Sequence, residues 1–428
     1  MDTREDKQSI IAKPDVIIIG AGPVGLWTAI QLKLHDPKTD ILMFEKYTEY
    51  KRRHILLLDK TSLIGTHNDP EFQKLIQDLP TKIRTTELES KLLQFAKQQG
   101  LNIQYKKVEN FSDLPKQFPS AKVIVGADGA HSKTREEIFD GNLSVNKNLK
   151  FIAELKYECK GSANELNLWT EAVPALAYTK HLVSEFVGKE KNGKTPVSLR
   201  LFIDEKAYNQ MQEARGGTYF SLKDTDKINS DLLISINAWL KARKMIAKEN
   251  RIPDSEKITV TKLAAYRSEA FVRQVDGTAW CLVGDAAFGV PYFRSLNNGL
   301  ISGTNLAKKL AAHLKPEIVE PSKSSLSFAE KSPLEEYSDF VSSLSNKQIR
   351  RAKVKSKGVS TLESSASSIQ TMPVTNWKLP RNYKQAMRRE EEKQPENHKS
   401  SLARFSKFSS FEDSNSSIED SSPSCTIL

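Results

Sequence analysis

Short apolar runs alternate with helical patterns over the first 150 residues of the chain. Residues 15–19, 41–44 and 123–125 are continuous runs of mostly β-branched and aliphatic side chains, which are typical of parallel strands buried on both faces. A helical pattern follows the first run over residues 23–34, and residues 86–99 form an amphipathic pattern with leucines on one side. This alternation predicts an α/β fold built on a parallel sheet.

The pattern changes in the middle of the chain. Residues 151–157, 197–203 and 258–263 alternate between apolar and polar positions, which predicts half-buried strands. One helix is expected over residues 232–248, after a polar capping position. These residues therefore predict a second, mainly β domain.

The first domain is expected to be discontinuous, because strand and helix patterns of its kind return over residues 279–313. We place its two parts at residues 1–150 and 271–345, with the inserted β domain at residues 151–270. Residues 346–428 are expected to form a basic and Ser-rich tail, whose composition beyond about residue 390 is typical of disorder. A helix over residues 335–348 is expected to pack on the first domain.

A glycine motif follows the first predicted strand directly. Gly20 permits a tight turn, Gly22 leaves room for a pyrophosphate, and Gly25 lets the helix approach the strand. Pro23 begins the helix, whose free N–H groups favour phosphate binding. Glu45 ends the second strand about 20 residues further along, where an acid binds ribose hydroxyls. The motif predicts a dinucleotide site; the alternative is a glycine-rich turn without a ligand.

Two further motifs identify the dinucleotide by resemblance. Residues 126–135, GADGAHSKTR, resemble the second fingerprint of the p-hydroxybenzoate-hydroxylase-like flavoprotein monooxygenases, and residues 281–287, CLVGDAA, resemble the third. In that family the Asp of each motif, here Asp128 and Asp285, contacts FAD. The resemblance covers roughly residues 13–315, and implies a Rossmann-like FAD domain with an inserted β-rich substrate domain.

Residues after the third motif depart from the family pattern. Phe288 stands where the family has His, and bulky or charged residues replace the central glycines of the segment 289–299. Tyr292 and Phe293 are the candidate pocket residues there. Arg52 or Arg53, after the strand end at Glu45 and Lys46, is placed to reach the pyrophosphate or NADPH, although solvated surface charge is an equal alternative for either one alone. The candidate cofactor contacts are Gly20, Gly22, Pro23, Gly25, Glu45, Lys46, Arg53, Asp128, Gly284, Asp285, Pro291, Asn297 and Asn298.

The cysteine content of the chain predicts neither a metal site nor a disulfide framework. Its three cysteines, Cys159, Cys281 and Cys425, lack metal-ligand spacing and suit a reducing compartment. No apolar run is long enough for a transmembrane helix, and the charged N-terminus lacks a secretory signal. The net charge of +11 is not accompanied by a nucleic-acid-binding motif, so attraction to an anionic membrane is the preferred interpretation.

The last four residues, Cys425-Thr-Ile-Leu, fit a prenylation pattern, and the terminal Leu favours geranylgeranyl. We expect a prenyltransferase to modify Cys425 and the chain to associate with the cytoplasmic face of a membrane. Four apolar residues at three-residue spacing over 402–411 are a candidate second membrane contact. The cluster Glu390–Glu392 and the Ser-rich tail resemble the signals of type IV secretion effectors. A bacterial protein delivered into a host cell is therefore one hypothesis of origin, and a eukaryotic enzyme is the other.

The sequence thus predicts an FAD-dependent, NAD(P)H-using monooxygenase that acts on a small molecule or lipid near a membrane. No catalytic acid or base is assigned, because in such enzymes the cofactor carries the difficult chemistry. Two alternatives stay open: a flavin oxidoreductase that acts on a lipid or prenyl group without inserting oxygen, and a non-catalytic prenylated interaction protein.

Overall fold

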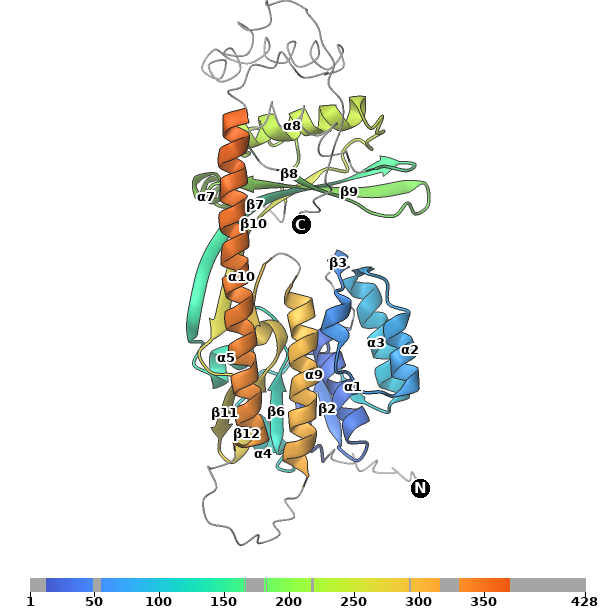
Figure 1. Ribbon diagram of the computed structural model, residues 1–428, viewed down its shortest axis with the longest axis vertical. Helices are drawn as coiled ribbons and strands as arrows, with labels where there is room; N and C mark the ends of the chain where they lie inside the picture. Colours follow the sequence, from blue (N-terminus) through green and yellow to red (C-terminus); the bar gives the residue numbers. More distant parts are fainter. Residues whose placement is uncertain are drawn as a thin grey trace, which may run out of the picture. The chain divides into compact units, whose positions relative to one another are not determined.

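The computed structural model describes residues 13–48, 55–164, 166, 181, 183–216, 219–291, 294–315 and 331–369 (Figure 1). The chain divides into two compact units. Unit 1 combines Met1–Leu149 with Lys262–Lys357, and unit 2 combines Lys150–Thr261 with Gly358–Leu428. Each unit has a hydrophobic core of its own. The predicted α/β fold with a discontinuous first domain is therefore confirmed.

Unit 1 is built on a six-stranded sheet with the order β11-β12-β6-β1-β2-β5. Strands β12, β6, β1, β2 and β5 are parallel to one another, and β11 pairs antiparallel with β12. The central strands are buried along their whole length, as their unbroken apolar sequences predict. The strands are β1 (Val16–Ile19), β2 (Ile41–Phe44), β5 (Asn102–Gln104), β6 (Val123–Gly126), β11 (Val272–Val275) and β12 (Thr278–Leu282).

Helices of unit 1 are held together by large aromatic side chains. The Trp27 ring of α1 contacts Phe72 of α2, which contacts Phe95 of α3. Trp27 Nε1 also donates to Thr304 Oγ1 of α9 over 2.9 Å, so α1 and α9 lie side by side. The helices are α1 (Pro23–His35), α2 (Pro70–Gln77), α3 (Thr85–Gln98), α4 (Leu114–Gln117), α5 (Lys133–Ile138) and α9 (Ser295–Leu314). Short elements are β3 (Ile55–Leu57), η1 (Lys60–Leu63), β4 (Lys82–Arg84), η3 (Gly284–Ala286) and β13 (Phe288–Gly289).

Helix α10 (Pro333–Ile369) is longer than the sequence pattern predicts. Its Tyr337 hydroxyl is buried and donates to the Leu282 carbonyl of β12, and Ile349 belongs to the core of unit 1. The domain boundary expected at residue 345 therefore falls inside a helix. Unit 1 extends along that helix to Lys357.

Unit 2 contains most of a five-stranded sheet with the order β13-β10-β7-β9-β8. Alternate residues of β7 and β9 face a core that also contains Trp239 and Leu232 of α8. Strands β7 and β10 cross the sequence boundary between the units. The elements are β7 (Leu143–Lys160), β8 (Val183–Val187), β9 (Lys194–Ile203), β10 (Lys257–Ser268), α7 (Glu205–Glu213) and α8 (Ser230–Met245). Among the described residues, no helix is long and apolar enough to span a bilayer.

A half-buried histidine near the end of α1 predicts acid sensitivity. Burial, with the nearby charges of His67, Lys308 and Lys315, lowers the pKa of His35 to about 4. The unfolded chain binds this proton below the ordinary histidine pKa of 6.5, whereas the folded chain resists it down to about 4. Stability should therefore fall as pH falls between these values. The slope should stay below the roughly 1.4 kcal/mol per pH unit of one fully linked proton.

Urea denaturation between pH 7 and pH 4 measures this slope. His35→Leu fills the half-buried site with an apolar side chain and removes the titrating imidazole. We expect a shallower dependence on pH in this variant than in the wild type. Identical slopes would show that His35 does not carry the effect.

Candidate cofactor site

The three sequence fingerprints meet at one edge of the unit 1 sheet. Strands β1, β6 and β12 are parallel neighbours, so their carboxyl ends lie together. Gly20 follows β1, Asp128 follows β6 by two residues, and Gly284 follows β12 by two residues. The backbone pairing continues past the strands: Ala127 N donates to Ile19 O, and Val283 N donates to Gly126 O. This edge is where ligands bind in open α/β sheets.

Two glycines of the first fingerprint are required by close backbone approach. Gly20 has φ +106°, and a Cβ there would lie 2.5 Å from the Ala127 carbonyl oxygen. A Cβ on Gly25 would lie only 1.9 Å from the Gly20 carbonyl oxygen. Gly22 is the N-cap of α1, with no side-chain cap, and Pro23 occupies the first turn. The first turn of α1 therefore keeps N–H groups available for an anion.

Glu45 is held by two backbone donors. Its Oε2 accepts from Ala21 N–H over 2.8 Å, and its Oε1 accepts from Tyr47 N–H over 3.0 Å. Each oxygen keeps a further lone pair for a ribose hydroxyl. Burial, with the charge of Glu45, raises the pKa of Glu89 on α3 to about 7. Lys46 Nζ lies over the Tyr47 ring, 4.9 Å from its centroid.

Asp128 organises the second fingerprint. Its Oδ1 accepts from the Ser132 hydroxyl over 2.6 Å, and its Oδ2 accepts from Thr134 N–H over 3.0 Å. Ser132 in turn caps α5 by accepting from Arg135 N–H. The carboxylate is therefore oriented by the first turn of α5. Its expected contact with the cofactor ribose remains a prediction.

Arg135 joins the second fingerprint to the third, a role that sequence reasoning missed. Its Nη1 donates to Ala286 O over 2.8 Å, and its Nη2 donates to Ala130 O over 2.9 Å. The guanidinium lies over the Tyr266 ring, and the Tyr266 hydroxyl donates to Asp285 O over 2.8 Å. Arg135 is the last residue of the GADGAHSKTR segment, and this position in the motif was the sequence feature that could have indicated its role.

Val24 joins the third fingerprint to the first. Gly284 has φ +62°, and a Cβ there would lie 2.9 Å from Val24 Cγ1. A Cβ on Gly299 would lie 2.5 Å from Val24 Cγ2. Val24 of α1 is therefore packed against Gly284 at the start of η3 and against Gly299 near the start of α9. Asp285 is half-buried beside this contact.

Asn297 and Asn298, which follow the third fingerprint, have different surroundings. Asn297 Nδ2 donates to Leu57 O, and its Oδ1 accepts from Asp59 N–H and the Ser62 hydroxyl, so this amide holds the β3–η1 segment. Asn298 is buried, and its Nδ2 has no hydrogen-bond partner among the described residues.

The remaining described residues of the segment 289–299 have varied surroundings. Arg294 Nη1 donates to Gln348 of α10 over 3.4 Å. Pro291 is half-buried. Tyr292 and Phe293, like Arg52, Arg53 and Cys425, lie outside the described residues.

Residues at this edge fit a dinucleotide such as FAD. The glycine turn before α1 leaves backbone N–H groups without a side-chain cap, which suits a pyrophosphate. Glu45 is oriented beside that turn, and the buried Asn298 Nδ2 is a donor that needs an acceptor. In the described part of the chain, no cluster of three or more His, Cys, Asp or Glu could hold a metal ion. Burial raises the pKa of both Cys159 and Cys281 to about 12, so neither thiol is a ready nucleophile.

Comparisons with known proteins support this fold. No family model and no curated protein sequence matches the chain. The solved structure of CabE, an aromatic hydroxylase from angucycline biosynthesis, matches with a TM-score of 0.54 at 15% identity, over 84% of this chain and 73% of its own. The flavin-dependent halogenase CmlS matches with a TM-score of 0.53 at 13% identity, over 91% of this chain and 72% of its own.

The Diels-Alderase PyrE3 from pyrroindomycin biosynthesis is a third similar structure. It matches with a TM-score of 0.50 at 15% identity, over 82% of this chain and 77% of its own. At sequence identities this low, structural similarity establishes the fold alone. The match to a Diels-Alderase is consistent with this, because one fold can support different reactions. The chain therefore has the fold shared by FAD-dependent hydroxylases and halogenases.

Proposed function

We propose that this chain is an FAD-dependent monooxygenase that takes reducing equivalents from NAD(P)H and acts at or near a membrane. The observation that carries the FAD part of the proposal is the convergence of three fingerprints on one sheet edge, joined there by Val24 and Arg135. A glycine-rich turn alone could be required by backbone packing, without any bound ligand. Three dinucleotide-type segments on adjacent parallel strands favour a single bound FAD.

Each part of this edge has a separate role toward the cofactor. The first turn of α1 at Gly22 would bind the pyrophosphate, and Glu45 would accept hydrogen bonds from a ribose. Asp285 would bind the ribityl region, and Asn298 Nδ2 would donate to a polar edge of the cofactor. When bound, FAD would supply the redox chemistry, since no protein side chain carries electrons from NAD(P)H to oxygen.

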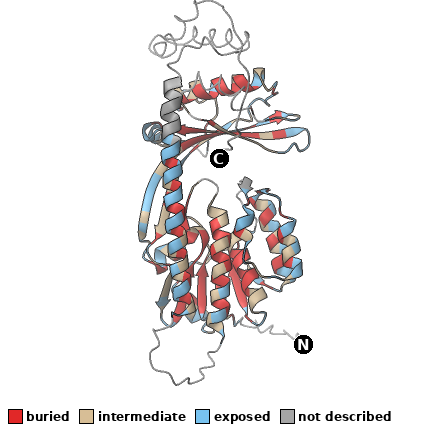
Figure 2. Ribbon diagram, viewed as in Figure 1, coloured by how far each residue is buried: buried red, intermediate tan, exposed pale blue. Residues whose placement is uncertain are grey.

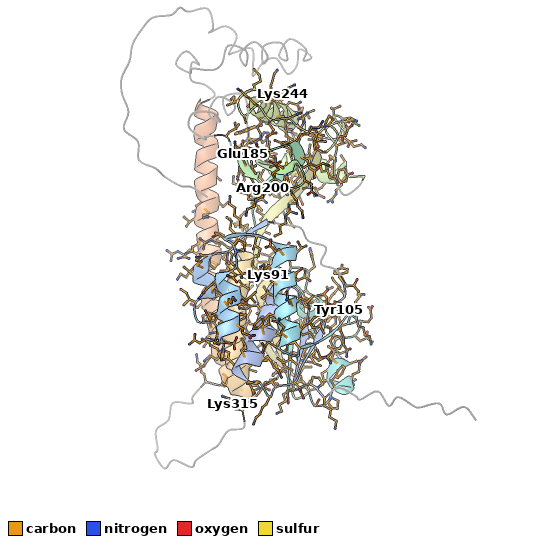
Figure 3. The ribbon with its side chains drawn as sticks, turned by 90° about the vertical axis from the view of Figure 1, so that its right-hand side faces the viewer. Lys91, Tyr105, Glu185, Arg200, Lys244 and Lys315 are labelled. Atoms are coloured by element: carbon orange, nitrogen blue, oxygen red, sulfur yellow. The ribbon has the colours of Figure 1, made fainter. Side chains whose placement is uncertain are left out.

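The sheet of unit 2 carries a charged cluster on one face. On the face opposite α8, Glu154 Oε1 accepts from Ser198 Oγ and Arg200 Nε, over 2.9 Å and 2.8 Å. Figure 3 shows Arg200 on β9 of this sheet. Burial opposes ionisation of Glu154, but Arg200 and Lys156 outweigh it and lower its pKa to about 2. We propose that this charged cluster helps to orient a polar group of the substrate.

The membrane part of the proposal depends on the tail. Cys425-Thr-Ile-Leu is a prenylation pattern, and one lipid needs a second contact for stable anchoring. Delivery by a bacterium into a host cell remains a hypothesis of origin, supported by the Glu390–Glu392 cluster and the Ser-rich tail. Tail deletion tests it, because unchanged translocation would remove this hypothesis.

A flavin protein that does not insert oxygen is the second candidate. The altered segment 289–299 favours it, because bulky and charged residues replace the central glycines and change how the backbone can approach the flavin. A non-catalytic interaction protein is a further alternative with the same fold.

Two measurements separate these candidates: reduction of the bound flavin by NADPH or NADH, and transfer of oxygen to a substrate. Anaerobic NADPH or NADH should bleach the absorbance of the bound flavin. With ¹⁸O₂ and a screened set of aromatic and lipid substrates, a monooxygenase incorporates one labelled oxygen atom into the product. Flavin reduction and product formation without label would favour the oxidoreductase. Failure of both nucleotides to reduce bound flavin would contradict the proposed function.

A further inference from the structure

A basic stripe follows the exposed side of α10. Lys347, Arg350, Arg351 and Lys357 are exposed, and at about 100° per residue they project within an arc of roughly 120°. Val354 lies at the centre of this arc and is 64% exposed. We call these five residues the basic stripe.

The opposite side of α10 fixes the orientation of the stripe. Ser345, Ile349, Ala352 and Ser356 are buried, and Ser356 Oγ donates to Leu149 O over 2.9 Å. Figure 2 shows the buried and exposed sides alternating along the helix. Because the buried side packs on unit 1, α10 cannot turn the basic stripe inward.

The charges of this region are not balanced within the helix. Residues 340–362 contain six basic residues and no acidic one. In the described part of the chain, Lys347, Arg350, Arg351 and Lys353 form no ion pair. Like charges three and four residues apart destabilise a helix, so the arrangement has a cost without an anionic partner. A solvated face would normally mix charges of both signs.

We propose that the basic stripe is a docking surface for an anionic lipid bilayer. Its charge complements anionic headgroups, and the exposed Val354 can enter the apolar boundary of the bilayer. The chain continues from α10 to the lipid-attachment pattern at Cys425, which by itself gives only a marginal anchor. The inference rests on the proposed membrane association and not on the flavin chemistry.

Vesicle sedimentation with unprenylated full-length protein tests the basic stripe. The vesicles contain phosphatidylcholine with or without 30 mol% phosphatidylserine, at about 0.1 M salt. We expect binding only to the anionic vesicles. Each basic residue near such a surface strengthens binding roughly fivefold, so Lys347→Gln, Arg350→Gln and Arg351→Gln together should weaken it on the order of 100-fold.

A matched variant controls for net charge. Lys38→Gln, Lys97→Gln and Lys116→Gln remove three exposed charges elsewhere on unit 1 and should leave binding unchanged. Equal binding of both triple variants, or equal binding to neutral vesicles, would overturn the proposal. Tighter binding to an RNA oligonucleotide, lost in the stripe variant, would assign the surface to nucleic acid instead. Flavin absorbance of the same samples reports the cofactor site separately.

Discussion

Gly25→Ala should strongly weaken FAD binding. The added Cβ would lie 1.9 Å from the Gly20 carbonyl oxygen, and that oxygen belongs to backbone that cannot rotate away. The turn before α1 must therefore open, which moves the N–H groups proposed to bind the pyrophosphate. Overpacking of this kind costs about 3 kcal/mol, equivalent to roughly 100-fold weaker binding. Fluorescence titration of FAD into the apoprotein measures the change.

Gly216→Ala is the matched control for this substitution. A Cβ at Gly216 meets open space, with no atom within 4 Å. Its FAD affinity should equal that of the wild type. Circular dichroism separates lost binding from lost folding in Gly25→Ala. Wild-type FAD affinity in a folded Gly25→Ala protein would show that the cofactor, if bound, uses another site.

Arg243→Met should be strongly destabilising to unit 2. Arg243 is fully buried, and its guanidinium donates to Glu185 of β8, to Glu249 and to the Asn164 carbonyl. Burial opposes its charge, but Tyr157, Glu185 and Glu249 raise its pKa above the ordinary value, so the group stays charged. Removing it leaves two carboxylates uncompensated, which costs about 3–5 kcal/mol. Urea denaturation measures this loss.

Lys244→Met, one position further along α8, controls for helix propensity and charge. Lys244 is exposed on α8, and Figure 3 labels both Lys244 and Glu185. Its substitution should change stability by less than about 0.5 kcal/mol. A similar loss in both variants would mean that the buried ion cluster contributes no more than an ordinary surface charge.

Local sequence patterns were sufficient to predict the sheet edge of unit 1. Gly20 and Glu45 are identified by their distance from apolar strands, and parallel strand ends must share an edge. The α/β fold followed from the same alternation of strands and helices. These features depend on residues that are close in sequence, which a single chain reveals.

Contacts between distant residues were not predictable in this way. Tyr266 packs on Gly289 and bonds to Asp285 O, and nothing in the spacing of these residues indicates the contact. Asn297 and Asn298 are adjacent in sequence, yet only the structure separates their surroundings.

Helix α10 was predicted too short for a different reason. Buried Ser345, Gln348 and Ser356 are polar, so the hydrophobic pattern of its core-facing side is interrupted. The structure satisfies part of this polarity, because Ser356 Oγ donates to Leu149 O.

An absorbance spectrum of the purified full-length protein is the most direct test for an FAD site at the sheet edge of unit 1. We expect the bands of oxidised flavin, with one FAD per chain after incubation with excess FAD and removal of the unbound cofactor. A folded protein that remains colourless after this treatment would contradict an FAD site at the sheet edge. It would leave the fold in place and favour a non-catalytic interaction protein.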